Sequence, residues 1–286
     1  MAVRVAREDA EMVLAELLEL APSGVEEVDI PGGQVEYAVY GAPGELPSLP
    51  ALTAAAGEAL VEIRTEEIAN DWAERWRRFH KPLVLGSRLC VRPPWEPPPG
   101  TDIDVVVDPG QAFGTGAHAT TRLCLELILE MGPGEGRPGA DRAPELGPFI
   151  DLGCGSGVLA ITAAKLGYGP VVGLDNDTAA LRAAADNAER NWVQVAVRRY
   201  DLRDEPVEIA IARTVAANLL ASLLLAWAGR LHASASMPER LIAGGLLAHD
   251  GDEVAAAFAP AGLREVERRT SGEWIALRLE RDPAAW

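Results

Sequence analysis

The sequence predicts an α/β protein in which a small α+β domain precedes a Rossmann-like domain with a seven-stranded sheet. A strand, a glycine-rich turn and a helix occupy residues 149–166, as in nucleotide-binding α/β folds. The first 63 residues give the order β-α-β-β-α-β, which is the ferredoxin-like split unit. We therefore expect domains at residues 1–63 and 81–286, joined by a helix over residues 64–80.

The first domain alternates between strand and helix patterns. Apolar residues such as Val13 and Leu17 recur at helical spacing, and Pro31-Gly32-Gly33 marks a hairpin. We expect strands at residues 2–5, 25–30, 35–40 and 60–63. We expect helices at residues 8–20 and 49–58. A sheet with one open face suits recognition of a protein substrate.

The joining helix carries Trp72 and Trp76, which lie four residues apart and therefore on one face. They are better explained as residues that bury this helix than as a ligand site. Two short strands around Gly86-Ser87 and a proline-rich connection at residues 93–99 follow.

The composition restricts the class of protein. The chain has 286 residues, of which 48% are hydrophobic, so it can form a sizeable core. It shows no apolar run of the roughly 18 residues that suggest a membrane span, and no signal-peptide pattern. Three widely spaced cysteines, Cys90, Cys124 and Cys154, give neither a disulfide framework nor a zinc site. We expect a cytoplasmic protein without a bound metal or a membrane partner.

The charge is strongly negative and unevenly distributed. A net charge of −17 argues against a nucleic-acid partner. Residues 1–62 hold twelve acidic residues against two arginines. This part of the chain is either a solvated acidic surface or a module that attracts a basic macromolecule, and both interpretations stay open.

The glycine-rich turn and the acid that follows it predict a nucleotide ligand. Gly153, Gly155 and Gly157 form the pattern G-x-G-x-G, and glycine lets the backbone approach a ligand closely. Asp175 ends the next apolar strand, where a carboxylate can accept hydrogen bonds from both hydroxyls of a ribose. With Asp151 before the turn, the pattern resembles the S-adenosylmethionine site of class I methyltransferases, where the leading acid helps hold the methionine ammonium. A glycine-rich turn in another α/β protein is the alternative.

A second glycine-rich segment, residues 108–121, leads into a helix expected over residues 122–131. Such a loop can close over a bound ligand, which makes Phe113 and Thr115 candidate cofactor contacts. The hydroxyl of Thr121 lies where it can cap the helix or touch the ligand.

Further motifs accompany this segment in a fixed order. They are D-W-A-E-R-W at 71–76, K-P-L at 81–83, R-P-P-W at 92–95, D-P-G-x-A-F-G-T-G-x-H-x-T-T at 108–121, A-N-L-L at 217–220 and G-E-W-I-A-L at 272–277. Over most of residues 60–280 the series resembles the bacterial ribosomal large-subunit protein eleven methyltransferase family. The N-terminal module resembles that family only in its expected topology.

The resemblance implies a class I methyltransferase fold and assigns the site. It implies cofactor contacts at Thr121, Gly153, Asp175 and Asn218, and the candidate set is completed by Asp151, Gly155, Phe113 and Thr115. Asn218 is also the candidate catalytic residue. It is a neutral acceptor that can take an N–H from an amine, whereas an acid would hold the ammonium form. A turn-forming asparagine is the alternative, and we expect His118 to order the loop.

The remaining elements complete the second domain. The third strand is expected at 193–197, followed by Asp201, where related enzymes often contact adenine. The fourth strand lies within 207–217, where Arg213 interrupts the apolar pattern. The other elements expected are helices at 158–166, 178–191, 219–231 and 253–258, a strand at 240–247, and a hairpin of 263–270 with 273–279.

We expect a monomeric enzyme that uses S-adenosylmethionine to methylate lysine side-chain or N-terminal amino groups of ribosomal protein eleven, as the resemblance implies. A lysine methyltransferase for another protein stays open, because the N-terminal module diverges. Two departures, Ala119 in place of the family's usual proline and the interrupting Arg213, also leave the substrate open.

Two alternatives come from other classes of protein. An NAD-dependent oxidoreductase fits poorly, because Val158-Leu159-Ala160 follow Gly157 where that class needs a further glycine. A binding module without activity is disfavoured by the intact Asp175 and Asn218.

Overall fold

The structure is a computed structural model, and the chain divides into two compact units, Met1–Arg78 and Phe79–Trp286. The residues that it describes are 1–20, 25–30, 33–39, 46–65, 81–108, 119–132, 146–231 and 237–281. The expected joining helix, with Trp72 and Trp76, falls almost entirely outside the described residues.

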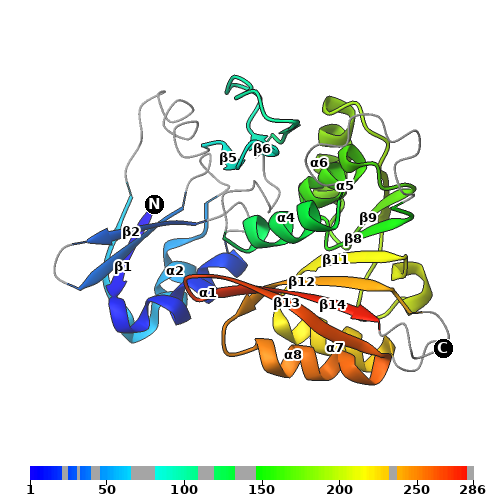
Figure 1. Cartoon of the computed structure of the whole chain (residues 1–286). Coiled ribbons are helices and arrows are strands. Elements are labelled where there is room, and N and C mark those ends of the chain that lie inside the picture. Colours follow the sequence, from blue (N-terminus) through cyan, green and yellow to red (C-terminus); the bar gives the residue numbers. More distant parts are fainter. Residues whose placement is uncertain are drawn as a thin grey trace. The chain divides into compact units, whose positions relative to one another are not determined.

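The first unit is a four-stranded antiparallel sheet in the order β2-β3-β1-β4. Alternate residues of β1, among them Val3 and Val5, are buried in a core shared with the helices. The expected element order is confirmed by β1 Ala2–Ala6, α1 Ala10–Leu20, β2 Glu26–Ile30, β3 Gln34–Ala38, α2 Leu49–Ala56 and β4 Leu60–Arg64 (Figure 1). Short 3-10 helices, Arg7–Asp9 and Gly57–Ala59, precede α1 and β4.

The face of this sheet turned away from the helices is charged. Arg4 alternates with the buried valines of β1, so it lies on that face. Its guanidinium Nε is 2.6 Å from a Glu36 carboxylate oxygen, and its Nη1 is 2.9 Å from a Glu62 carboxylate oxygen. Residues from three neighbouring strands therefore form one ion-pair network.

The second unit is organised around a seven-stranded sheet in the order β10-β9-β8-β11-β12-β14-β13. The first five strands of that order are parallel, and β14 is antiparallel to both of its neighbours. The strands are β8 Phe149–Leu152, β9 Val171–Asp175, β10 Ala196–Arg199, β11 Thr214–Asn218, β12 Arg240–Leu247, β13 Leu263–Ser271 and β14 Trp274–Arg281. The seven-stranded sheet expected from the sequence is confirmed.

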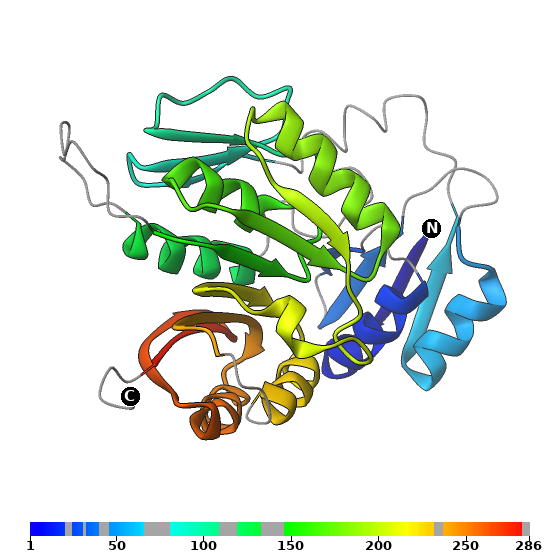
Figure 2. The same cartoon turned by 90° about the vertical axis from the view of Figure 1, so that its right-hand side faces the viewer.

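Helices cover both faces of this sheet (Figures 1 and 2). Phe149 and Ala216 belong to the core under α4 and α5, whereas Ile150 and Val215 belong to the core under α7 and α8. The helices are α4 Ala119–Met131, α5 Val158–Leu166, α6 Thr178–Arg190, α7 Ala221–Leu231 and α8 Gly251–Phe258, with 3-10 helices at Val207–Ala210 and Ala259–Ala261. None of the described helices combines the length and apolar character needed to cross a lipid bilayer.

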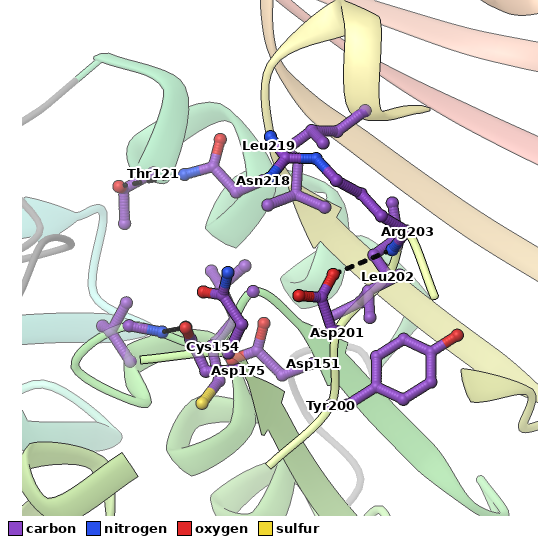
Figure 3. Close-up of a pocket in the computed structure, with 17 residues that line it drawn as sticks. Thr121, Asp151, Cys154, Asp175, Tyr200, Asp201, Leu202, Arg203, Asn218 and Leu219 are labelled. Atoms are coloured by element: carbon purple, nitrogen blue, oxygen red, sulfur yellow. Dashed lines mark hydrogen bonds between the residues drawn. The ribbon is translucent and has the colours of Figure 1, made fainter. Parts of the chain in front are cut away.

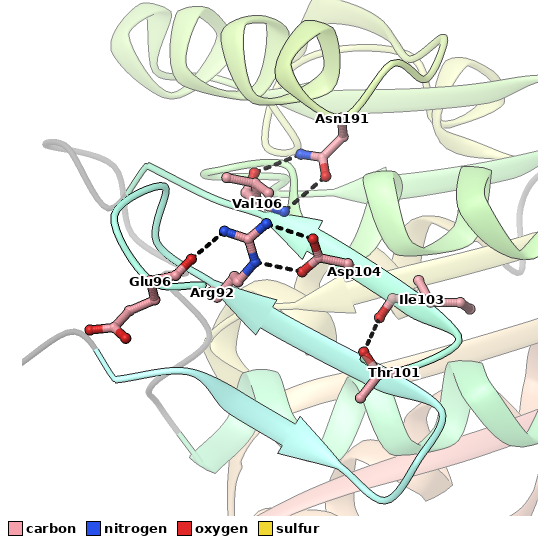
Figure 4. Close-up of polar contacts among 7 residues, drawn as sticks. All are labelled: Arg92, Glu96, Thr101, Ile103, Asp104, Val106 and Asn191. Atoms are coloured by element: carbon pink, nitrogen blue, oxygen red, sulfur yellow. Dashed lines mark hydrogen bonds and ion pairs between the residues drawn. The ribbon is translucent and has the colours of Figure 1, made fainter. Parts of the chain in front are cut away.

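A separate three-stranded sheet, β5 Leu83–Leu85, β6 Leu89–Arg92 and β7 Ile103–Val106, packs on the core of α4 and α5. The strands β5 and β6 were expected and β7 was not. Its polar Asp104 hides the apolar pattern, yet this carboxylate holds the Arg92 guanidinium through two hydrogen bonds of 2.8 and 2.7 Å (Figure 4).

Two strands differ from expectation for local reasons. The third strand begins at Ala196 rather than at residue 193, because Trp192 takes a φ of +57° and the Val193 amide still bonds back to the Ala188 carbonyl. The fourth strand is confined to Thr214–Asn218. Arg213 precedes it, is exposed and pairs with Glu239 at 2.7 Å, so it does not interrupt the strand.

A substitution at Trp227 tests the packing beneath the large sheet. Its side chain is 0% exposed, and its ring meets Phe258 edge-on at a centroid distance of 5.7 Å. Trp227→Ala is expected to lower the free energy of unfolding by about 3–5 kcal/mol, because a cavity is left. Urea unfolding followed by circular dichroism measures it. The matched control is Trp192→Ala, whose side chain is 94% exposed and whose loss should cost no more than about 0.5 kcal/mol. Equal losses in the two variants would contradict the packing.

Candidate functional site

A pocket of about 250 Å³ lies at the carboxyl ends of β8, β9 and β11 (Figure 3). In the sheet β8 has β9 on one side and β11 on the other, although β9 follows it in the chain and β11 does not. This is the switch point at which open α/β sheets bind ligands. The lining residues are Thr121, Asp151, Leu152, Gly153, Cys154, Gly155, Val158, Leu159, Asp175, Asn176, Tyr200, Asp201, Leu202, Arg203, Asn218, Leu219 and Leu223.

The glycine-rich turn lines the pocket with backbone atoms. Side chains would not fit at two of its glycines. Gly153 has a φ of +74°, and a Cβ at this position would lie 2.4 Å from the Leu219 side chain. Gly157 has a φ of +80°, and a Cβ there would meet Ala184 of α6 at 3.0 Å. The backbone is thereby free to approach a ligand.

Asp175 is fixed at the tip of β9 by backbone amides. Its Oδ2 accepts a hydrogen bond of 2.9 Å from the Gly155 amide, and its Oδ1 accepts one of 3.0 Å from the Asp177 amide. A carboxylate has about four acceptor positions, so two amides leave capacity for a diol. The turn and the carboxylate that faces it are held in one arrangement.

Asp151 is a buried acid with an unpaired oxygen. The residue is 1% exposed, its Oδ2 accepts from the Ala160 amide at 3.0 Å, and its Oδ1 has no hydrogen-bond partner among the described residues. Burial raises the pKa of Asp151 to about 7, the Ala160 hydrogen bond opposes the rise, and the charge of Asp175 adds to it. An acid held in this way favours a cation beside it.

Asn218 lies where β11 leaves the sheet. Its Nδ2 donates a hydrogen bond of 3.4 Å to the Thr121 hydroxyl of α4 (Figure 3). Its Oδ1 is buried without a partner in the described part of the chain. Gly244 lies opposite Asn218 in β12, and a Cβ there would approach Cys124 Sγ to 2.3 Å and Asn218 Oδ1 to 3.1 Å. The absence of a side chain at Gly244 makes room for both neighbours.

A tight turn after β10 forms the remaining wall. Asp201 accepts a hydrogen bond of 3.0 Å from the Arg203 amide, and Figure 3 shows it beside Tyr200. Arg230 of α7 donates to the carbonyl oxygens of Leu202 and Glu205, which anchors this turn. Sequence reasoning placed only Asp201 here. It missed Tyr200, Leu202 and Arg203, because the strand that presents them was expected three residues too early.

Most of the expected site residues converge. The pocket brings together Thr121, Asp151, Gly153, Gly155, Asp175 and Asn218. Phe113, Thr115 and His118 lie outside the described residues. The three cysteines are free and buried, and the part of the chain that is described contains no metal-holding group of three or more His, Cys, Asp or Glu residues.

The donors and acceptors of the pocket fit a ligand with a ribose and a cationic end. The Asp175 carboxylate can accept hydrogen bonds from a diol. The buried Oδ1 atoms of Asp151 and Asn218 have no hydrogen-bond donor in the described part of the chain. Together with the sheet order, this site defines a class I methyltransferase that depends on S-adenosylmethionine.

Comparison with known proteins identifies the family. Residues 48–282 match the family model described as ribosomal protein L11 methyltransferase (PrmA). The chain belongs to this family, and S-adenosylmethionine is its cofactor. The oxidoreductase alternative is thereby set aside.

Relatives and a solved structure agree with this assignment. A ribosomal protein L11 methyltransferase of Chloroflexus aurantiacus is 38% identical over 244 residues, which cover 75% of this chain and 70% of the relative. That of Pelotomaculum thermopropionicum is 42% identical, with 72% and 64% covered. The crystal structure of a ribosomal protein L11 methylase from Lactobacillus delbrueckii subsp. bulgaricus has a TM-score of 0.57 at 27% identity, with 70% of this chain and 98% of that chain covered.

The raised pKa of Asp151 predicts a pH-dependent stability. The pKa of about 7 in the folded protein lies above the value of about 3.9 for a free carboxyl. The contribution of the neutral carboxyl to the free energy of unfolding is therefore fully present below about pH 4 and is lost as the pH rises through 7. Relative to Asp151→Asn, the ligand-free protein should lose up to about 1.4 kcal/mol of unfolding free energy per pH unit in this window. Urea unfolding at several pH values measures the difference. Parallel pH profiles for the two proteins would refute the assignment.

Proposed function

We propose that this protein transfers methyl groups from S-adenosylmethionine to amino groups of ribosomal protein L11. The observation that carries the proposal is the family match over residues 48–282, which includes every described residue of the pocket. The relatives from Chloroflexus aurantiacus and Pelotomaculum thermopropionicum are named for this substrate.

The cofactor would be held by three groups of residues. Asp175 would accept the ribose hydroxyls, Asp151 would face the methionine ammonium, and the backbone at Gly153 and Gly155 would line the ligand. Thr121, Phe113 and Thr115 are proposed as further contacts. When bound, S-adenosylmethionine supplies a methyl group on a positively charged sulfur, so the methyl group needs no further activation.

Asn218 is proposed to orient the acceptor amine. A lysine side chain with a pKa near 10.4 is protonated at pH 7, and presenting its neutral form costs about 4.6 kcal/mol. A carboxylate would stabilise the unreactive ammonium. The unpaired Oδ1 of Asn218 can instead accept one N–H of a neutral amine, which aims the nitrogen lone pair. Because this Oδ1 is buried in the ligand-free structure, the carboxamide would have to turn from its hydrogen bond with Thr121 toward the pocket to reach the amine.

The N-terminal unit is proposed to recognise the substrate. The unit spans Met1–Arg78, which includes the predicted domain over residues 1–63, and most of it precedes the region that matches the family model. Twelve acidic residues lie within residues 1–62, and Glu36 and Glu62 line the sheet face around Arg4. Arg4 pairs with both of these carboxylates, so it is the excess of acidic residues over residues 1–62 as a whole that favours a basic protein by charge.

The overall charge of the chain bears on its direct partner. A net charge of −17 favours a basic protein over RNA as the direct partner. We propose a cytoplasmic, monomeric enzyme. The alternative, a different lysine-bearing protein as substrate, is tested by the experiment that tests L11.

Intact-mass spectrometry of ribosomal protein L11 from the same organism, incubated with the enzyme and S-adenosylmethionine, tests the function. Stepwise additions of methyl groups are expected. Asn218→Ala should lower kcat by about 100-fold, a larger change than its loss of affinity for S-adenosylhomocysteine. The enzyme has two lysines, Lys81 and Lys165, so an enzyme-only incubation separates self-methylation. No additions to L11 by an enzyme that binds S-adenosylhomocysteine would refute this substrate.

A further inference from the structure

Asn187 of α6 joins two segments that lie far apart in the sequence. Its side chain is buried, with the residue 1% exposed. Its Oδ1 accepts a hydrogen bond of 3.0 Å from the Asp108 amide, and its Nδ2 donates one of 3.0 Å to the Ser156 carbonyl. One amide group therefore connects the chain just after β7 with the glycine-rich turn of the cofactor pocket.

Asn191, one helical turn later, holds the same strand without touching the pocket. Its Oδ1 accepts from the Val106 amide at 2.8 Å, and its Nδ2 donates to the Val106 carbonyl at 2.6 Å (Figure 4). The amides of Val106 and Asp108 point to the same side of an extended chain, because they are two residues apart. Asn187 of α6 and the C-cap residue Asn191, four positions later, thus bond along the edge of β7 that does not pair with β6.

The glycine-rich turn is consequently held from two sides. The Gly155 amide donates to Asp175 of β9, and the carbonyl of the next residue, Ser156, accepts from Asn187 of α6. Gly157 then packs against Ala184, one turn before Asn187 on the same helix. The direction of the Ser156 carbonyl determines the plane of the peptide that follows it, so Asn187 helps set the path of the turn.

We propose that Asn187 is a positioning residue that couples occupancy of the cofactor pocket to the backbone at Asp108. A ligand that immobilises the turn also immobilises Ser156. Through Asn187 it then restrains the chain at Asp108, the first residue of the D-P-G segment. The inference rests on cofactor binding in this pocket and not on the identity of the methyl acceptor. Asn187 touches neither reacting group and acts only through these two backbone contacts.

The test combines calorimetry with amide hydrogen exchange, using S-adenosylhomocysteine as the probe. In the wild-type protein the ligand should slow exchange in the peptide covering residues 103–108. Asn187→Leu, which keeps the branched shape of the side chain and removes both hydrogen bonds, should weaken binding about tenfold and abolish that slowing. An unchanged exchange rate in the liganded wild-type protein would overturn the proposal without any variant.

Asn191→Leu is the matched control, because the same substitution at the C-cap of this helix removes two contacts with Val106 and one with the Asn187 carbonyl, but none with the glycine-rich turn. It should speed exchange near Val106 but leave the affinity within about twofold and keep the ligand-induced slowing. Equal losses of affinity in both variants would reduce Asn187 to a general structural role. If Asn187→Leu does not fold, Asn187→Asp keeps the acceptor for Asp108 and removes the donor to Ser156. This variant should weaken binding, and wild-type affinity in it would contradict the proposal.

Discussion

The parallel register of β8, β9 and β11 is the constraint on which the site depends. Leu152 lies opposite Leu174 on one side and opposite Ala217 on the other. The residues that follow these three, Gly153, Asp175 and Asn218, therefore reach the same edge of the sheet together. Three segments distant in sequence supply a backbone turn, a carboxylate and a carboxamide to one pocket.

The site is arranged at a cost to the ligand-free fold. The buried Oδ1 atoms of Asp151 and Asn218 have no partners among the described residues, and an unsatisfied buried acceptor costs about 1–3 kcal/mol. Burial raises the pKa of Asp151 for the same reason. Contacts with α5 and α4 hold the two side chains, through the Ala160 amide for Asp151 and through the Thr121 hydroxyl for Asn218.

Much of the site could be predicted because its signals are local. The glycines, Asp175 and Asn218 stand at strand ends that short apolar runs identify, and the element order followed from the same runs. The contacts of Asn187 and Arg230 could not be predicted, since each joins a helix to a distant backbone carbonyl. The strand β7 was missed because Asp104, which pairs with Arg92, breaks its apolar pattern. Phe113 and Thr115 stay predictions.

Asp175 is proposed to hold the ribose of the cofactor, and calorimetric titration with S-adenosylhomocysteine tests this role most directly. Asp175→Ala should weaken binding by about 100-fold or more, because two charge-assisted hydrogen bonds are lost. Asp177→Ala is the control, since this nearby acid caps α6 and does not line the pocket. It should leave the affinity within a few fold. Binding to Asp175→Ala as tight as to the wild-type protein would contradict the account.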